Sequence, residues 1–260
     1  MKFSGNFKLI GSNIKIGQNV KIGDGTIIYD NVSIGDNTII CNDCVIGEPI
    51  QDYYFNENYE NPPCSIGANS LIRSHTIIYC NVTIGENFST GHRVTIRENS
   101  IFGDHCKLGT LTDIQGYCTI GSYVWLHSNV HICQGAQIDN FVFIYPFVVL
   151  TNDPHPPSNI CSGPHVGAYT QIAVSSVLLP DSRIGEHVLI GANSVVGGVV
   201  ADYSLVIGNP AKFKMDVRSI KSKDKNSSTP FHYPWPNNFK RGMPWEELGF
   251  MKWNELTKEI

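Results

Sequence analysis

Apolar side chains recur at nearly every sixth position over most of this chain, and this period restricts the fold more than any other feature. Between residues 84 and 150 the repeat passes through twelve consecutive positions, here called rungs: Ile84, Thr90, Ile96, Phe102, Leu108, Ile114, Ile120, Leu126, Ile132, Ile138, Ile144 and Leu150. Only Thr90 among them is not apolar. A period of six fits neither an α-helix nor a plain strand, but it fits short strands joined by tight corners, with the rungs turned inward. The chain is therefore predicted to be an all-β protein, a parallel β-helix.

The repeat begins near the N-terminus and is interrupted twice. Further rungs stand at Ile10, Ile16, Ile22, Ile28, Ile34, Ile40, Ile46, Ile66, Ile72, Ile78, Val166, Ile172, Leu178, Ile184, Ile190 and Val196. The gaps predict loops over Glu48–Pro63 and Asn152–His165. Three rungs make one coil of 18 residues, so residues 18 apart stack along the solenoid. Both loops follow rungs of one face, Ile46 and Leu150, so we expect them to leave from one edge, roughly six coils apart. A shared edge favours a functional role for both loops, although corners also tolerate insertions without one.

Beyond the repeat, the run Val206–Lys212 is expected to form a closing strand and turn, and Phe213–Lys223 a short amphipathic helix. Lys221–Thr229 has the composition of a polar linker. We therefore expect a β-helix domain over residues 1–212, followed by an extension over 213–260 that holds the helix, the linker and an aromatic tail.

The tail from Pro230 to Ile260 holds three of the four tryptophans, Trp235, Trp245 and Trp253. Trp245–Trp253 is expected to be helical. So many aromatic side chains are expected to be shielded from water by contact with another surface. One interpretation packs them over the open end of the solenoid or onto a neighbouring subunit. The other makes them a flap that stacks on the base of a substrate.

Composition excludes several classes of function. Apolar content of 42% and charged content of 16% indicate an ordered protein. The net charge of −4 gives no support for nucleic-acid binding, and no apolar run reaches the length of a membrane span. Without a signal-peptide core in Met1–Gly11, a soluble cytoplasmic protein is expected. The eight cysteines fit reduced thiols, and because the repeat already accounts for Cys44, the C-x-x-C pair with Cys41 does not favour a zinc or redox role.

The repeat, together with the run from Ile207 to Lys212 (IGNPAK), resembles the left-handed β-helix acyltransferases that use acyl-CoA. The resemblance covers roughly Phe3–Lys214. It implies a left-handed solenoid, a homotrimer and active sites between adjacent solenoids. Three further runs are most similar to the nucleotide-sugar acyltransferases of that family: TGHRVTIRENS (90–100), LHSNVHI (126–132) and VVLTNDPHPPS (148–158). The resemblance therefore implies N-acylation, with acetyl-CoA or another acyl-CoA as co-substrate and no metal, of an amino sugar carried on dTDP or UDP, such as a dTDP-3-amino-3,6-dideoxyhexose.

Polar residues gather along two predicted edges. Counting by coils places one group together at a first edge: His75, His92, Asp113, His127, Asn129 and His131. The edge that carries both loops holds a second group: Glu98, Gln134, Asn152, Asp153 and His155. If adjacent solenoids bring these two edges together, the cleft between them presents histidines from one chain and amides and loops from the next. That arrangement is a hypothesis.

Acyl transfer to an amine requires a neutral amine close to the thioester and a donor for the oxyanion, and a histidine has a suitable pKa to take the proton. His92, His127 and His155 are the candidate bases, and His155 is included because it resembles the base of sugar O-acetyltransferases with this fold. A mechanism without a protein base, in which the CoA thiolate takes the proton, also remains open. The candidates for binding the acceptor substrate or the thioester carbonyl are Glu98, Asp113, Asn129, Gln134, Asn152 and Asp153.

Coenzyme A is expected along the later coils, where small residues let its pantetheine arm approach the backbone. Lys212 and Lys214, with Arg218, are candidates for pairing with its phosphates. The alternative is that these three residues are ordinary solvated charges.

Three other functions stay open. A sugar O-acetyltransferase would share the fold and the donor. A zinc enzyme similar to the γ-type carbonic anhydrases would bind the metal with three histidines across a subunit interface, here His92, His127 and His131. However, His92 and His127 are 35 residues apart, one short of two coils, and so do not share a column. A scaffold without catalytic activity would not bind acyl-CoA.

Overall fold

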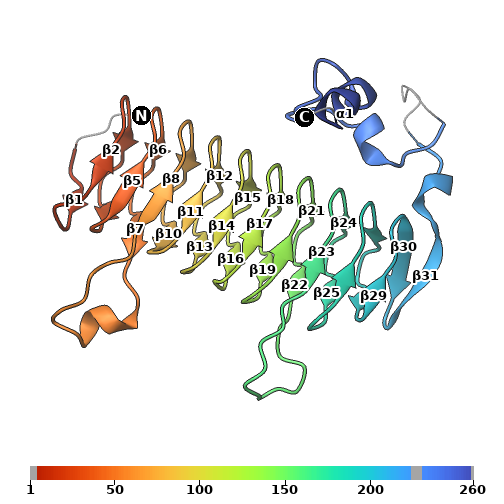
Figure 1. Ribbon diagram of the computed structural model, residues 1–260, viewed down its shortest axis with the longest axis horizontal. Coiled ribbons are helices and arrows are strands. Elements are labelled where there is room, and N and C mark those ends of the chain that lie inside the picture. Colours follow the sequence, from red (N-terminus) through yellow and green to blue (C-terminus); the bar gives the residue numbers. More distant parts are fainter. Residues whose placement is uncertain (1–4, 224–229, 259–260) are drawn as a thin grey trace.

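The computed structural model describes residues 5–223 and 230–258, and it forms a triangular solenoid that lies lengthwise in Figure 1. Every rung from Ile84 to Leu150 is at most 3% exposed. In most of the two-residue strands the second residue faces the core and the first faces outward, as in Asp113–Ile114. The predicted parallel β-helix is therefore confirmed.

Three sheets form the sides of the solenoid, and in the described residues they contain 10, 10 and 11 strands. Sheet A consists of β1 (Lys8–Leu9), β4 (Ile27–Ile28), β7 (Val45–Glu48), β10 (Ile77–Tyr79), β13 (Thr95–Ile96), β16 (Asp113–Ile114), β19 (His131–Ile132), β22 (Val149–Leu150), β25 (Val177–Leu178) and β28 (Val195–Val196). Sheet B consists of β2 (Lys15–Ile16), β5 (Val32–Ile34), β8 (Cys64–Ile66), β11 (Thr83–Ile84), β14 (Ile101–Phe102), β17 (Thr119–Ile120), β20 (Gln137–Ile138), β23 (His165–Val166), β26 (Arg183–Ile184) and β29 (Val199–Val200). Sheet C consists of β3 (Lys21–Ile22), β6 (Ile39–Ile40), β9 (Leu71–Ile72), β12 (Ser89–Thr90), β15 (Lys107–Leu108), β18 (Trp125–Leu126), β21 (Phe143–Ile144), β24 (Gln171–Ile172), β27 (Leu189–Ile190), β30 (Ser204–Gly208) and β31 (Ala211–Asp216).

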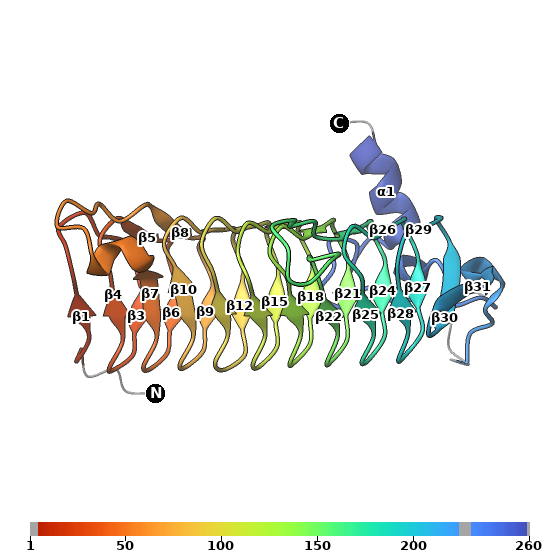
Figure 2. The same cartoon turned by 90° about the horizontal axis from the view of Figure 1, so that it is seen from below.

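Strands of successive coils pair in parallel and stand side by side along the solenoid (Figure 2). Away from the loops, paired residues are 18 apart, as in Asp113↔His131. Most corners contain a residue with left-handed backbone, which is why asparagine is frequent there. Asn129, with φ of 58°, is one of these corner residues.

Both predicted loops leave the edge between sheets A and B. Loop 1 (residues 49–63) joins β7 to β8 and contains the 3₁₀ turn η1 (Gln51–Tyr54). Loop 2 (residues 151–164) joins β22 to β23, and His165 already belongs to β23. Figure 1 shows both loops projecting from the same side. Five strand pairings separate β7 from β22, so the expected spacing of six coils was one too large.

The first rung was predicted one residue too late. Leu9, rather than Ile10, stands opposite Ile28 in the register of sheet A. An additional residue before Ile16 absorbs the shift. Nothing covers this end of the solenoid among the described residues, so Leu9, Ile10 and Ile16 are 49%, 37% and 41% exposed.

The expected helix over Phe213–Lys223 is wrong. The chain instead turns at Asn209 and Pro210 and forms β31, which pairs antiparallel with β30. β31 satisfies hydrogen-bonding groups that β30 would otherwise leave at the sheet edge, and η2 (Val217–Ser219) follows it. The expected boundary at residue 212 therefore falls inside a strand. Most of the polar linker Lys221–Thr229, residues 224–229, lies outside the described residues.

The aromatic tail packs on the side of its own solenoid and not over its open end. Phe141 and Phe143 form a buried cluster with Trp235, Met243 and Trp245. Trp235, in η3 (Trp235–Asn237), donates its indole N–H to the carbonyl oxygen of Tyr169 at 2.7 Å. The helix expected from Trp245 begins later, as α1 (Phe250–Lys258). The tail and the two loops lie on opposite sides (Figure 1). No helix in the described part of the chain has the length and apolar character needed to span a bilayer.

Candidate active site

The outward surface of sheet A, here called face A, carries a group of interacting polar side chains between the two loops. Between loop 1 and loop 2 it is formed by β10, β13, β16 and β19. Because the first residue of each short strand points outward, the side chains of Asp113 and His131 stand on this face, one coil apart.

Asp113 and His131 form a hydrogen-bonded pair. Their Cα atoms are partners across β16 and β19, and His131 Nδ1 lies 3.1 Å from Asp113 Oδ2. Gln115 donates its side-chain N–H to the same carboxylate oxygen at 2.5 Å. Because Asp113 binds Nδ1, the Nε2 atom of His131 is left for a ligand.

A groove of about 660 Å³ opens beside His131. The solenoid lines it with Cys133, Leu150, Leu179 and Pro180 in addition to His131. Loop 2 contributes the remaining lining residues, Thr151, Asn152, Asp153, Pro154 and Pro156. The groove therefore combines a histidine with a largely apolar surface, which is usual for a ligand site.

Asp153 organises loop 2 from within. Its carboxylate accepts hydrogen bonds from the backbone N–H groups of His155 and Ser158 at 2.9 and 2.8 Å, and from the Ser158 hydroxyl at 2.6 Å. The hydrogen bonds from Ser158 are the main reason why the pKa of Asp153 is lowered. Asn152 donates to the carbonyl oxygen of Gln134 at 3.3 Å and so ties the loop to the coil below. Asn152 and Gln134 are therefore neighbours, as predicted.

Electrostatics favour a charged carboxylate beside the histidine. The hydrogen bond from His131 lowers the pKa of Asp113, and the bond from Gln115 acts in the same direction. His127 lies at the corner before β19 and stacks on Tyr145 with ring centroids 4.8 Å apart. Partial burial lowers the pKa of His127, which favours its neutral form.

The other residues predicted at the two edges are spread along face A. His92 is exposed at the corner before β13, and its backbone N–H donates to Thr110. The strand that follows His92 is β13, and it is two strand pairings away from β19, the strand that contains His131. Glu98 accepts hydrogen bonds from Arg97 at 3.0 and 2.8 Å and lies at the same coil as β13. His92 and Glu98 are thus not brought to the groove.

His155 is exposed in loop 2 and is not one of the residues that line the groove. Lys212 and Lys214 are exposed on β31, the last strand of sheet C. Arg218 is held by Asp216, with its closest approach at 2.6 Å, and its guanidinium lies 4.2 Å from the centre of the Tyr203 ring. The end of the solenoid therefore presents two exposed lysines and an arginine that already has a carboxylate partner.

Within residues 5–223 and 230–258, no three histidine, cysteine or acidic side chains come close enough together to hold a metal ion. His92 and His127 lie at corners two coils apart. The three histidines on which a zinc site would depend are thus not assembled in the chain.

The sequence analysis included His131 in the histidine edge but not among the three candidate bases. Its spacing of 18 residues from Asp113 could have indicated the hydrogen-bonded pair, because this spacing puts the two outward side chains on paired strands. No comparable signal shows that loop 2 lines a groove with His131, because that depends on the path of the loop.

Two segments of the solenoid, residues 13–48 and 163–198, match the family described as bacterial transferase hexapeptide (six repeats). The first segment ends at β7 and the second begins just before β23. These repeats indicate that the β-helix is left-handed, as the resemblance implied.

Solved structures with a similar chain path include the UDP-N-acetylglucosamine acyltransferase from Campylobacter jejuni, at 19% identity over 86% of this chain and 79% of that chain, with a TM-score of 0.43. An N-acyltransferase from Bacillus cereus, in complex with dTDP-4-amino-4,6-dideoxyglucose and coenzyme A, is 17% identical over 55% of this chain and 80% of its own, with a TM-score of 0.30. PerB from Caulobacter crescentus, in complex with CoA and GDP-perosamine, is 17% identical over 68% of this chain and 70% of its own, with a TM-score of 0.28. At these identities and TM-scores, the similarity to the three structures does not indicate what chemistry this chain performs.

Proposed function

The chain is a hexapeptide-repeat β-helix protein, and we propose that it is an acyltransferase that moves an acyl group from acyl-CoA to the amine of a nucleotide-linked amino sugar. The observation that carries this proposal is the Asp113–His131 pair on face A, which borders the groove under loop 2. The acceptor class rests on the runs that resemble the nucleotide-sugar acyltransferases, and the groove supplies a place where such chemistry can proceed.

His131 is the base in this proposal. The amine attacks the thioester carbonyl and the new C–N bond gives a tetrahedral intermediate, from whose nitrogen His131 Nε2 takes a proton. The C–S bond then breaks, which leaves the amide, and His131 gives the proton to the CoA thiolate. Asp113 keeps the Nδ1–H tautomer in place and stabilises the imidazolium that forms. We prefer His131 to His92, His127 and His155 because it both lines the groove and has a carboxylate partner.

The two halves of face A differ in a way that supports separate subsites. Over β13 and β16, the polar half, the outward residues are mostly polar and include Arg97, Asp113 and Gln115. From the groove onwards, over β22, β25 and β28, they are mostly apolar and include Val177 and the groove residue Leu179. We assign the acceptor to the polar half and the acyl-pantetheine arm to the apolar half, so that the thioester and the amine meet at His131. Asn152 borders this meeting point and is hydrogen-bonded to Gln134, while Lys212 and Lys214 lie on β31 of sheet C, at the C-terminal end of the solenoid.

A homotrimer is part of the proposal, because none of residues 5–223 and 230–258 covers face A opposite loop 2. Leu111 and Phe147 occupy corners beside this face and are 49% and 57% exposed. Large apolar side chains at such exposure favour contact with a neighbouring solenoid. Light scattering coupled to gel filtration tests this point, and a monomeric mass would contradict it.

Thiol release from acetyl-CoA tests the activity directly. The acceptors are a panel of dTDP- and UDP-linked sugars with the amine at carbon 3 or carbon 4. We expect turnover with at least one of them, and mass spectrometry should show a product heavier by one acetyl group. No thiol release with any acceptor, at saturating acetyl-CoA and with longer acyl donors also tried, would count against the proposal.

A sugar hydroxyl is the second candidate acceptor, because a histidine with a carboxylate partner is also the group that a hydroxyl nucleophile needs. The panel therefore contains the matched sugar with a hydroxyl in place of each amine. Preference for the hydroxyl member of a pair would make the protein an O-acyltransferase and leave the site assignment unchanged.

A further inference from the structure

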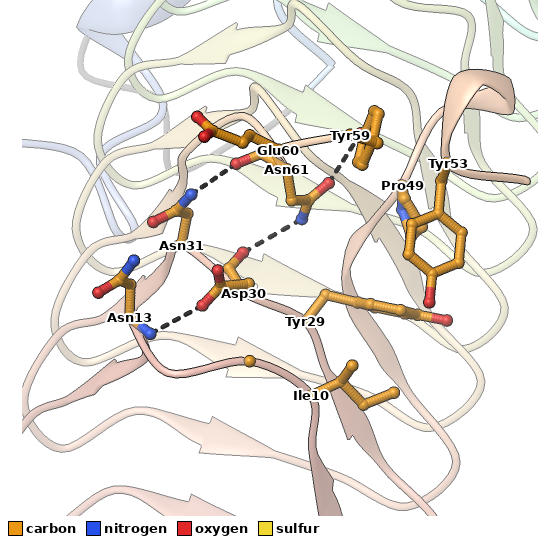
Figure 3. A pocket seen from close by; sticks show the side chains of 11 residues that line it. Ile10, Asn13, Tyr29, Asp30, Asn31, Pro49, Tyr53, Tyr59, Glu60 and Asn61 are labelled. Atoms are coloured by element: carbon orange, nitrogen blue, oxygen red, sulfur yellow. Dashed lines mark hydrogen bonds between the residues drawn. The ribbon is translucent and has the colours of Figure 1, made fainter. Parts of the chain in front are cut away.

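A second pocket, of about 330 Å³, lies under loop 1 and is separate from the groove. It is lined by the turn after β1, the corner after β4 and loop 1, which contributes Pro49, Tyr53 and Tyr59 among others (Figure 3). Five strand pairings separate β4 from β19, which is about 24 Å at the usual spacing of strands. One ligand of ordinary size therefore cannot occupy this pocket and touch His131.

Hydrogen bonds hold the walls of the pocket in place. Asn61 is 8% exposed and donates to the carbonyl oxygens of Gly47 and Asp30 at 2.9 and 3.1 Å. Its own side-chain oxygen accepts from the Tyr59 hydroxyl at 2.9 Å. Asn31 donates to the Asn61 carbonyl oxygen at 2.7 Å. Loop 1 is thus anchored to the solenoid at the pocket, and the pocket is formed before any ligand arrives.

The aromatic side of the pocket is a corner of three tyrosines. The rings of Tyr29 and Tyr53 are 6.0 Å apart and nearly perpendicular, at 80°, and those of Tyr53 and Tyr59 are 5.7 Å apart at 81°. Burial is the main reason why the pKa of Tyr29 is raised, so its phenol is neutral at physiological pH. Perpendicular neutral rings offer electron-rich faces in more than one direction.

The opposite side of the pocket is negative. Asp30 and Glu60 are among the lining residues, and no lysine, arginine or histidine is. The Asp30 carboxylate accepts a hydrogen bond from the backbone N–H of Asn13 at 2.7 Å, and Glu60 is exposed at the rim. Loop 1 also carries Asp52 and Glu57, and it contains no basic residue. Figure 3 shows Asp30, Asn31 and Asn61 facing Tyr29 and Tyr53 across the pocket. A phosphate or carboxylate is repelled here, whereas a cation is attracted by both sides.

We propose that the loop 1 pocket binds a small organic ammonium ion, such as a diamine, with its charge between the Glu60 and Asp30 carboxylates and its carbon chain against the tyrosine rings. Aromatic faces and carboxylates together are the usual partners of such ions in proteins. The nucleotide part of an acceptor substrate, which is an anion, is not the ligand of this pocket. The tyrosines of loop 1 therefore serve a separate ligand.

Isothermal titration of the full chain with putrescine tests the proposal without reference to turnover. We expect saturable binding that weakens as salt is raised, and no comparable binding of 1,4-butanediol, which has the same length without charge. Glu60→Gln should weaken putrescine binding by about fivefold or more. Glu57→Gln removes an equal charge from the same loop outside the pocket and is expected to bind as the wild type does.

Tyr53→Leu should also weaken binding, and Tyr53→Phe, which keeps the ring, should retain it. The phenylalanine variant keeps the test decisive if the leucine variant fails to fold. Putrescine binding that is unchanged by Glu60→Gln, equal binding of 1,4-butanediol, or no saturable binding to the wild type would each overturn the proposal.

Discussion

The solenoid carries two histidine–aspartate pairs of nearly the same geometry, and only one of them borders the groove under loop 2. His131 Nδ1 lies 3.1 Å from Asp113 on face A, and His165 Nε2 lies 3.0 Å from Asp139 on the outward side of sheet B. The side chains are exposed to similar extents, 40% and 37% in the first pair and 35% and 46% in the second. The pair alone therefore does not distinguish the two places.

The surroundings of the two pairs distinguish them. The second pair borders an open depression whose lining includes Arg183, Glu186 and Asp202, and neither loop lines it. Its histidine also uses Nε2 for the carboxylate, which leaves Nδ1, the nitrogen nearer its own backbone. The pair on face A has Gln115 as a second donor and loop 2 as a wall. A histidine–aspartate pair that is common on a surface thus becomes a candidate site where an inserted loop forms a groove beside it.

Replacing each histidine gives the largest contrast. His131→Asn should lower kcat/KM by about 10²–10⁴, because it removes the base and leaves binding of the two substrates largely intact. His165→Asn should stay within about twofold of the wild type, since its ring touches no part of the groove. Thiol release measured side by side with the best acceptor checks both.

Equal losses in the two variants, with unchanged circular dichroism, would remove the distinction between the pairs. Full activity in His131→Asn would return the choice to His92, His127, His155 or a mechanism in which the thiolate takes the proton.

The wall of the groove is the second point to test. Asp153→Ala removes three hydrogen bonds inside loop 2, so the loop loses the conformation in which it lines the groove beside His131. We expect KM for the acceptor to rise by about tenfold, with a smaller change in kcat, because substrate positioning is lost before chemistry is. Asp181→Ala, on the exposed corner next to Pro180, is the matched control, and a similar rise in KM there would mean that the loop itself is not responsible.

The period of six allowed the sheets, the columns and the shared edge of both loops to be predicted, because each coil repeats one geometry. It also placed Asp113 next to His131, since paired residues are 18 apart. Predictions from the period were wrong at the two ends of the solenoid, where a coil has a neighbouring coil on one side only. At the N-terminal end an additional residue moved the rung from Ile10 to Leu9, and beyond Gly208 the open edge of β30 was filled by a strand instead of a helix.

Loop paths and the position of the tail could not be derived from the period. The shape of loop 2 depends on the bonds of Asp153 and on its prolines, and the tail depends on a column of outward aromatic residues that includes Phe141 and Tyr169. Those residues stand at corners, where the repeat does not fix the side-chain type. The period of six predicts the solenoid, whereas the hydrogen bonds within loop 2 determine which of its polar groups line the groove.

Gln115 distinguishes the two pairs further, because the carboxylate of Asp139 has no corresponding second donor: among the described residues only His165 is hydrogen-bonded to that carboxylate. Gln115→Ala should lower kcat by about threefold to tenfold and leave KM nearly unchanged, since the carboxylate that orients His131 becomes less well held. Gln115→Glu places a like charge beside Asp113 and should be worse than alanine. Rates of Gln137→Ala, a change beside His165, provide the control, and a drop in that variant alone would contradict the assignment.

The smallest expected effect is on stability and follows from the carboxylate of the pair. Its hydrogen bonds lower the pKa of Asp113 below its ordinary value of 3.8, so the folded state favours the charged form. The resulting stabilisation is fully present above that ordinary pKa and is lost as the pH falls through the lower pKa of the folded state. Because both side chains are partly exposed, we expect Asp113→Asn to reduce the free energy of unfolding by at most about 1 kcal/mol at pH 7. Urea unfolding between pH 2 and pH 7 should show the wild type and Asp113→Asn converging at the acid end, and about the same difference at every pH would show that charge is not its source.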